Sequence, residues 1–117
     1  MSRSAFDELA GRLAAFARER DWEQFHSPKN LAMAMSAEAA ELLEHFQWLT
    51  ESQSRDLSPE AREAVALEMA DVLLYLVRLA DQLGVDLLDA ADRKLVINAR
   101  KYPVAESRGH SRKYTEL

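Results

Sequence analysis

The chain has 117 residues, of which 48% are hydrophobic and 30% charged, and this composition is typical of a folded protein rather than a disordered one. The absence of cysteine excludes disulfides, thiolate metal sites and thiol nucleophiles. The net charge of −5 argues against a nucleic-acid polymer as the main partner. At this length we expect a single domain over residues 1–117.

The sequence carries no membrane or export signal. No apolar run approaches the roughly 20 residues of a membrane-spanning helix, and the first residues lack the apolar region of a signal peptide. We therefore expect a cytoplasmic protein without a membrane partner.

Glycine and proline occur only three times each, which indicates long helices with few turns. A serine followed by proline is a typical helix start, because the hydroxyl caps free amides and proline fits the first helical position. Glycine typically stops a helix, aspartate caps the next one, and proline disfavours helical geometry in the residue before it. These signals occur at Ser27-Pro28, Ser58-Pro59, Gly84, Asp86 and Pro103.

No stretch alternates between apolar and polar residues for long enough to predict a strand. The sequence therefore predicts an all-α, four-helix antiparallel bundle-like domain. We expect helices at about 4–20, 28–50, 59–83 and 86–101, a polar connection at 51–57 and an irregular, basic tail at 103–117.

Two pairs of acidic residues lie within the apolar stripes of the second and third predicted helices. The pairs are Glu38-Ala-Ala-Glu41 and Glu68-Met-Ala-Asp71. Residues three positions apart are neighbours on a helix surface, so each pair presents two carboxylates side by side. Both pairs lie in mid-helix, where the helix dipole no longer stabilises negative charge. Carboxylates facing the protein interior need a counter-charge, and a divalent cation is the simplest one.

Two antiparallel helices in contact can point these pairs at one another. Glu38, Glu41, Glu68 and Asp71 are therefore candidate ligands of one or two cations, and oxygen-only ligands favour Mg²⁺ or Mn²⁺ over zinc. The alternative is a solvated helix edge, which is the usual position of a single such pair. Glu44 continues the first series, but it lies roughly 120° around the helix from Glu38, so we expect it to be exposed.

Other chemistry receives less support from the sequence. Di-iron bundles need two Glu-x-x-His motifs, and this chain has one, Glu23-Gln-Phe-His26, so oxidase chemistry is not expected. From Arg93 to Lys113 basic residues greatly outnumber acids. Such a segment could bind a polyanion of limited size, and the alternative is a solvated tail.

Four motifs between Asp21 and Pro103 occur in a characteristic order. They are Asp21-Trp-Glu-Gln-Phe-His26-x-Pro28-Lys-Asn30, Glu38-x-x-Glu41-x-x-Glu-x-Phe-Gln-Trp48, Glu68-x-x-Asp71-Val-Leu-x-Tyr75-Leu and Lys94-x-x-x-Asn98-x-Arg-Lys-Tyr-Pro103. In this combination the chain closely resembles the MazG-like all-α nucleoside triphosphate pyrophosphohydrolases. It is nearest to their dCTP pyrophosphatase branch, down to the ending Ser111-Arg-Lys-Tyr-Thr-Glu-Leu117.

The resemblance implies Mg²⁺-dependent hydrolysis of a deoxynucleoside triphosphate, dCTP or a modified dCTP, to the monophosphate and pyrophosphate, as a cleaning step of the nucleotide pool. It also implies a homodimer or homotetramer. Glu38, Glu41, Glu68 and Asp71 match the metal-binding acids of the family. Glu38 or Glu41 would act as the general base toward water, and the sequence does not choose between them.

The resemblance also indicates which residues contact the nucleotide. Aromatic positions around the base and sugar are matched here, as are polar positions on the last helix, and Lys101 could neutralise phosphate charge. The expected contacts are Trp22, His26, Trp48, Tyr75, Lys94, Asn98 and Lys101. The alternative is packing for the first three and a solvated helix face for Lys94 and Asn98.

Two departures from the family pattern bear on base selectivity. Leu13 lies where some relatives carry a polar residue, and the 51–57 connection is short. Alternative functions are a related pyrophosphohydrolase acting on dUTP or a damaged nucleotide, and a non-catalytic helical oligomerisation module.

Overall fold

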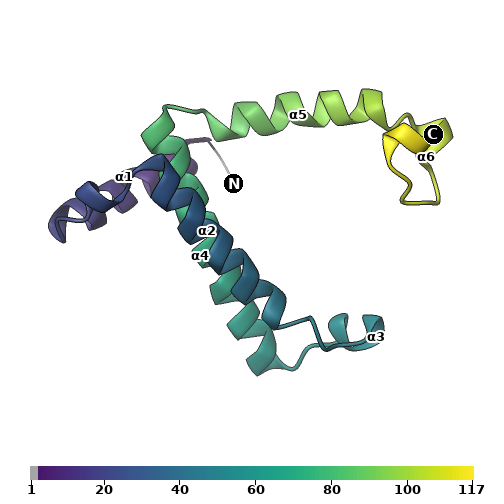
Figure 1. The fold of residues 1–117 in the computed structure, drawn as a ribbon, viewed down its shortest axis with the longest axis horizontal. Helices are drawn as coiled ribbons and strands as arrows, with labels where there is room; N and C mark the ends of the chain where they lie inside the picture. The colour runs from purple at the N-terminus through teal and green to yellow at the C-terminus, as the bar shows by residue number, and fades with distance from the viewer. Residues whose placement is uncertain (1–2) are drawn as a thin grey trace. The chain divides into compact units, whose positions relative to one another are not determined.

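The computed structural model describes residues 3–117, and every regular element in this range is helical. The predicted all-α fold class is therefore confirmed. No helix within the described range has the length and apolar character needed to cross a bilayer. In chain order (Figure 1) the elements are α1 (Arg3–Glu19), η1 (Glu23–Phe25), α2 (Pro28–Glu44), α3 (Glu51–Ser54), α4 (Pro59–Leu83), α5 (Leu87–Lys101), α6 (Val104–Ser107) and η2 (Tyr114–Glu116).

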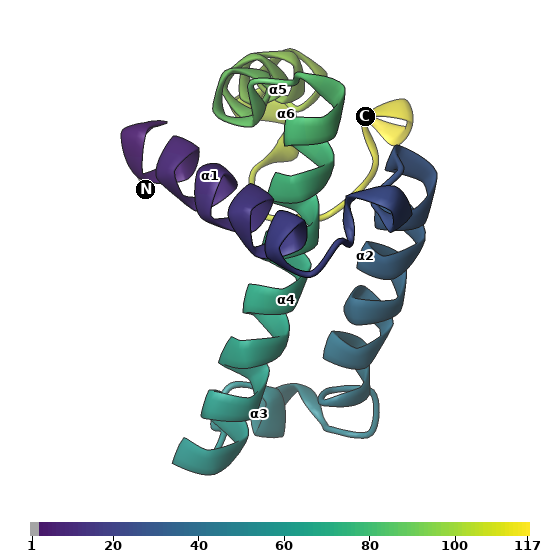
Figure 2. The same cartoon turned by 90° about the vertical axis from the view of Figure 1, so that its left-hand side faces the viewer.

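The chain divides into two compact units, Met1–Val85 and Asp86–Leu117. In the first unit α2 and α4 lie side by side and run in opposite directions, and α1 crosses α4 (Figure 2). Small and branched apolar side chains fill the contacts between these three helices, because they allow close approach of the backbones. The buried apolar residues are Ala17, Leu31, Val65, Val77 and Ala80. A single domain over residues 1–117 stays a prediction.

The predicted starts of the second and third helices and the predicted stop at Gly84 are confirmed. Ser27 Oγ accepts a hydrogen bond from the Asn30 amide at 3.2 Å, and Ser58 Oγ accepts one from the Ala61 amide at 3.1 Å. Each serine is followed by proline at the first helical position. Gly84 ends α4 in the left-handed conformation, with φ of 65°, which glycine adopts without a steric penalty.

The predicted end of the second helix at residue 50 is wrong, because α2 ends at Glu44. Thr50 instead begins α3: its side chain accepts from the Gln53 amide at 3.1 Å, and the Gln53 side chain accepts from the Thr50 amide at 2.9 Å. This reciprocal capping box requires extended backbone at Thr50, with ψ of 164°, so α2 must end earlier. The 51–57 connection therefore contains a short helix.

In the second unit Asp86 caps α5 by accepting from the Asp89 amide at 3.0 Å, as predicted. The prediction of an irregular 103–117 segment is wrong, since α6 and η2 both lie in it. The Tyr114 ring meets Tyr102 edge-on at 6.1 Å, and Lys101 Nζ lies 4.7 Å from the Tyr114 ring centre. The tail thus folds back onto the end of α5, through contacts between residues distant in sequence that periodicity does not reveal.

Candidate functional site

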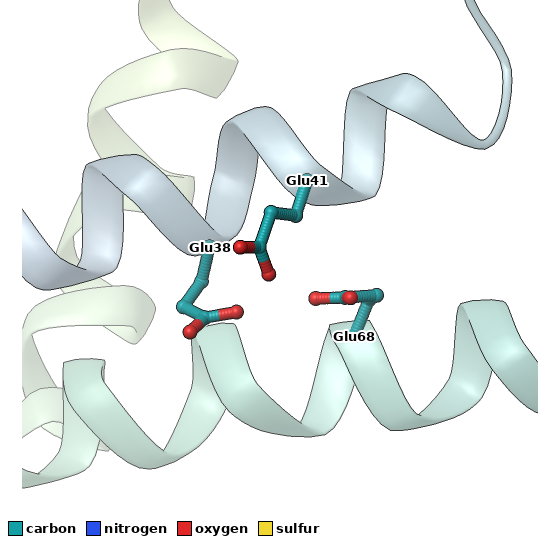
Figure 3. Close-up of side chains that lie close together, drawn as sticks. All are labelled: Glu38, Glu41 and Glu68. Atoms are coloured by element: carbon teal, nitrogen blue, oxygen red, sulfur yellow. The ribbon is translucent and has the colours of Figure 1, made fainter.

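Three glutamates from two helices meet between α2 and α4. Glu38 and Glu41 project from successive turns of α2, and Glu68 projects toward them from α4 (Figure 3). One carboxylate oxygen from each lies within 4.8 Å of the others. Glu38 and Glu68 are half-buried and Glu41 is exposed. The predicted convergence of acids from the two helices is therefore present for these three residues, and Glu44 is exposed as expected.

The closeness of the carboxylates disfavours full ionisation. The Glu41 carboxyl group, to which a protonated Glu38 can hydrogen-bond, is the largest cause; burial and the negative charges of Glu41 and Asp71 add to it. Together these effects raise the pKa of Glu38 from 4.5 to about 7. In the absence of a cation, the cluster therefore holds a proton near neutral pH.

The donor set fits a hard divalent cation. Within residues 3–117, the Glu38 Oε2 and Glu68 Oε2 atoms are buried and have no hydrogen-bond partner. Ionised carboxylates are acceptors only, so they cannot satisfy one another. His45 Nε2 lies 4.0 Å from Glu68 Oε1 and offers one positive partner when protonated. An oxygen-coordinated cation would satisfy both orphaned oxygens and offset the remaining negative charge.

Asp71, the fourth predicted ligand, lies outside the set of oxygens within 4.8 Å. It is one turn further along α4 than Glu68, is exposed, and its charge still acts on Glu38. It also lines a neighbouring cavity together with Tyr75, which follows after one more turn. Asp71 therefore joins the acidic cluster to the cavity, and its role as a ligand stays a prediction.

The cavity has a volume of about 240 Å³ and is lined mainly by apolar and aromatic side chains of α1, of α4 and of the two residues that flank η1. Pockets for whole drug-sized ligands have roughly 300–1,000 Å³, so this one suits a single flat ring system. The lining residues are Leu13, Phe16, Trp22, His26, Asp71, Leu74, Tyr75 and Arg78. Of the residues predicted to contact a nucleotide, the structure thus brings Trp22, His26 and Tyr75 together beside Asp71.

A sharp turn after α1 places Trp22 at the cavity. The Trp22 amide donates to Ala17 O at 2.9 Å and the Asp21 amide donates to Arg18 O at 3.1 Å, the two bonds of a Schellman motif. Asp21 takes the left-handed conformation this motif requires, with φ of 56°. The chain direction changes there, so the Trp22 ring meets the Phe16 ring edge-on at 5.8 Å.

Arg78 is a site residue that the sequence interpretation missed. It is 5% exposed, and its Nε donates to His26 Nδ1 at 3.2 Å while its Nη1 pairs with Asp81 Oδ2 at 3.3 Å. A signal was available, because Arg78 lies seven residues after Asp71 and three after Tyr75, on the same face of α4. Phe16 and Leu74 were also missed, since apolar helix residues carry no signal that separates a cavity wall from a core.

The structure does not test the other predicted contact residues. Trp48 follows α2 in a turn and is 87% exposed, away from the cavity lining. Lys94, Asn98 and Lys101 lie on α5 in the second unit, where Lys94 is exposed and Lys101 contacts Tyr114. Their contacts with a nucleotide stay predictions.

Known proteins are similar to this chain in sequence and in fold. A family model described as MazG-like matches residues 33–117. Human dCTP pyrophosphatase 1 is 51% identical over 106 residues, and the bovine protein of that name is 44% identical over 118 residues. The crystal structure of a pyrophosphatase from Archaeoglobus fulgidus superposes with a TM-score of 0.78 at 41% identity and covers 83% of this chain and 91% of that one.

The match covers these relatives unequally. The aligned residues span 89% of this chain but 62% of the human protein, and 99% of this chain but 70% of the bovine protein. The chain therefore spans about two thirds of the length of these relatives.

Proposed function

Because this chain belongs to the MazG-like family, we propose that it is a Mg²⁺-dependent nucleoside triphosphate pyrophosphohydrolase. It cleaves a deoxynucleoside triphosphate, dCTP or a modified dCTP, to the monophosphate and pyrophosphate and so cleans the nucleotide pool. The observation that carries the proposal is the Glu38–Glu41–Glu68 cluster beside an aromatic cavity. Asp71 connects the two, because it lines the cavity and its negative charge acts on Glu38.

The metal ligands in this proposal are Glu38, Glu41, Glu68 and Asp71. The two orphaned buried oxygens, Glu38 Oε2 and Glu68 Oε2, support a cation at this position. Bound Mg²⁺, or Mn²⁺ in its place, would neutralise triphosphate charge and acidify a water molecule.

The protein contributes proton transfer and orientation. A carboxylate of Glu38 or Glu41 accepts the proton of the water that attacks phosphorus. Both side chains project from α2 into the cluster (Figure 3). The choice between them is left to the pH–rate profiles of the two single variants.

The aromatic cavity receives the base in this proposal. Flat rings stack on nucleobases with roughly 1–3 kcal/mol per base, and Trp22 and Tyr75 offer such faces. The apolar Leu13 wall accepts an unsubstituted or methylated ring edge and offers no hydrogen bond. This chemistry supports a pyrimidine, and the names of the human and bovine relatives support cytosine.

Other parts of the proposal rest on the family resemblance. Trp48, Lys94, Asn98 and Lys101 contact the nucleotide, and the protein forms a homodimer or homotetramer. Exposed large apolar side chains, among them Leu67 at 60% and Met69 at 57%, support self-association. A cytoplasmic location remains a prediction from the sequence.

The decisive experiment measures pyrophosphate release from dCTP with Mg²⁺ for wild type and for Glu41→Gln and Asp71→Ala. Each substitution removes a negative oxygen donor, and we expect each to lower turnover by at least about 100-fold. Glu44→Gln is the matched control, because Glu44 lies one turn beyond Glu41, is exposed and is outside the cluster. Wild-type turnover in both Glu41→Gln and Asp71→Ala would refute the assignment.

The same assay with other triphosphates separates the rival functions. A dUTP or damaged-nucleotide enzyme would show its highest kcat/KM with one of those substrates and would keep the same dependence on Glu41. A non-catalytic helical module would release no pyrophosphate from any triphosphate, and Mg²⁺ would leave its melting temperature unchanged.

A further inference from the structure

Arg78 is 5% exposed and lines the proposed base cavity. Among residues 3–117 its guanidinium has three hydrogen-bond partners. Nε donates to His26 Nδ1 at 3.2 Å, Nη1 donates to Asp81 Oδ2 at 3.3 Å, and both Nη atoms reach the Gln82 amide oxygen at 3.2 Å in the amide orientation that satisfies both groups. The Nε–H is therefore directed at the imidazole, while the other end of the guanidinium is held by α4 itself.

The chemistry of this hydrogen bond determines which ring nitrogen of His26 carries the proton. An arginine side chain is always protonated and has no acceptor, so it can only donate. Nδ1 of His26 must therefore be an unprotonated acceptor, and in a neutral imidazole the proton then resides on Nε2. Burial and the Arg78 charge lower the pKa of His26, which agrees with a neutral ring.

The ring is also held in place by its surroundings. The His26 amide donates to Glu23 O at 3.2 Å at the end of η1, and the Trp22 and His26 rings meet edge-on at 6.4 Å. Because Arg78 occupies Nδ1, Nε2 is the ring nitrogen left for a ligand in the cavity that His26 lines.

We propose that Arg78 is a positioning residue for base recognition, which holds His26 as the Nε2–H tautomer so that its ring donates a hydrogen bond to an acceptor atom of the nucleobase. The inference rests on the proposed function and assigns His26 a defined part in it. The acceptor is a ring carbonyl, such as the 2-oxo group of a pyrimidine, rather than a phosphate oxygen, because Phe16, Trp22 and Tyr75 form the neighbouring walls and suit a flat ring.

The first test does not depend on enzymatic activity. Long-range ¹H–¹⁵N correlation spectra of the imidazoles report which ring nitrogen bears the proton, and with three histidines in the chain His26 is assigned by its loss in His26→Gln. We expect a protonated Nε2 and an unprotonated Nδ1 for His26 in the metal-free wild type at neutral pH. A protonated Nδ1 would overturn the proposal, whatever the enzyme's activity.

The second test separates positioning from support of the fold. Arg78→Met removes every donor, and we expect a roughly 5–10-fold rise in KM for dCTP with little change in kcat. Arg78→Lys keeps a positive donor near His26 and should restore part of the affinity. Asp81→Asn weakens the ion pair but leaves the Arg78–His26 contact, so its KM should stay near wild type. An equal rise in KM for Asp81→Asn would mean that Arg78 acts only by stabilising α4, which would overturn the proposal.

The identity of the acceptor is tested with 2-thio-dCTP, in which a weaker acceptor replaces the 2-oxo group. Wild type should bind it less tightly than dCTP, and Arg78→Met should lose most of this discrimination. If discrimination is unchanged and Arg78→Met instead weakens competition by pyrophosphate, the acceptor is a phosphate oxygen and the assignment to the base is wrong. If wild type hydrolyses no triphosphate at all, the proposed function fails while the tautomer remains measurable.

Discussion

At the scale of single residues, the main feature is a group of carboxylates whose full ionisation is disfavoured by mutual repulsion and partial burial. Glu38 has a pKa raised to about 7 by Glu41, by burial and by Asp71. A group whose pKa is higher in the folded than in the unfolded protein stabilises the fold below its unfolded pKa. That contribution is lost as the pH rises through the folded pKa, here between about 4.5 and 7.

We therefore predict that the metal-free protein becomes less stable as the pH rises from 5 to 8. After allowance for solvent screening the loss is on the order of 1–2 kcal/mol. Because other groups also titrate, the quantity to measure is the difference in melting temperature between wild type and Glu38→Gln at each pH. Between pH 5 and pH 8 the melting temperature of wild type should fall by roughly 5–10 °C relative to that of Glu38→Gln. A difference in melting temperature that stays constant with pH would contradict the prediction.

Mg²⁺ should reverse this trend, because a cation and a proton compete for the same oxygens. We predict that saturating Mg²⁺ raises the melting temperature more at pH 8 than at pH 6, and that the apparent affinity for Mg²⁺ increases over this interval. Titrations followed by differential scanning fluorimetry at both values would measure the effect. Glu44→Gln should respond as wild type does, and a Mg²⁺ effect independent of pH would count against a shared proton.

Residue spacing was enough to predict part of this site. The interval of three residues placed Glu38 beside Glu41, and the apolar stripes indicated that their helix faces the one carrying Glu68. Spacing could not separate Asp71 from the cluster, because that separation depends on side-chain rotamers and on the distance between the helices. The contact between His26 and Arg78 spans 52 residues in sequence, so only the folded chain reveals it.

At the scale of helices, boundaries marked by strong local chemistry were predicted well. Serine-proline starts and the Gly84 stop determine local geometry without help from the rest of the fold. The end of α2 was also marked by a local signal, the capping box of Thr50 and Gln53, and the prediction was wrong because it did not use that signal. The reason that α6 and η2 were missed is different. They occur together with contacts of Tyr114 to Lys101 and Tyr102, which are more than ten residues away in sequence and carry no local signal.

The cap at the start of α4 should contribute measurably to stability. Ser58→Ala removes the acceptor of the Ala61 amide, and we expect a loss of about 1 kcal/mol in the free energy of unfolding. Urea denaturation followed by circular dichroism would measure it. Ser52→Ala serves as the control, since Ser52 is exposed and lies within α3 rather than at a cap. A loss of similar size in both variants would mean that the cap contributes nothing specific.

At the scale of the whole molecule, several large apolar side chains of the first unit are exposed to solvent. Leu43, Leu67 and Met69 are each more than half exposed, and they lie on the two helices that bear the acids. The family resemblance predicted a homo-oligomer as well.

We predict that the wild-type chain sediments as a dimer or tetramer at micromolar concentration. Met69→Lys, which places a charge at a position 57% exposed, should shift the equilibrium toward the monomer. Ser52→Lys adds the same charge at an exposed polar position and should not. Analytical ultracentrifugation over a range of concentrations would decide, and a monomeric wild type would remove the premise.

The reversed backbone at Asp21 has a consequence for which mutations the protein tolerates. A residue at φ of 56° is strained unless it is glycine, asparagine or aspartate, and this turn precedes the Trp22 indole that lines the cavity. A saturation screen at position 21 should therefore recover few survivors. Bulky or branched replacements should reduce nucleotide discrimination before they reduce helix content. The reason is that a changed turn would displace the Trp22 ring while leaving α1 and α2 folded.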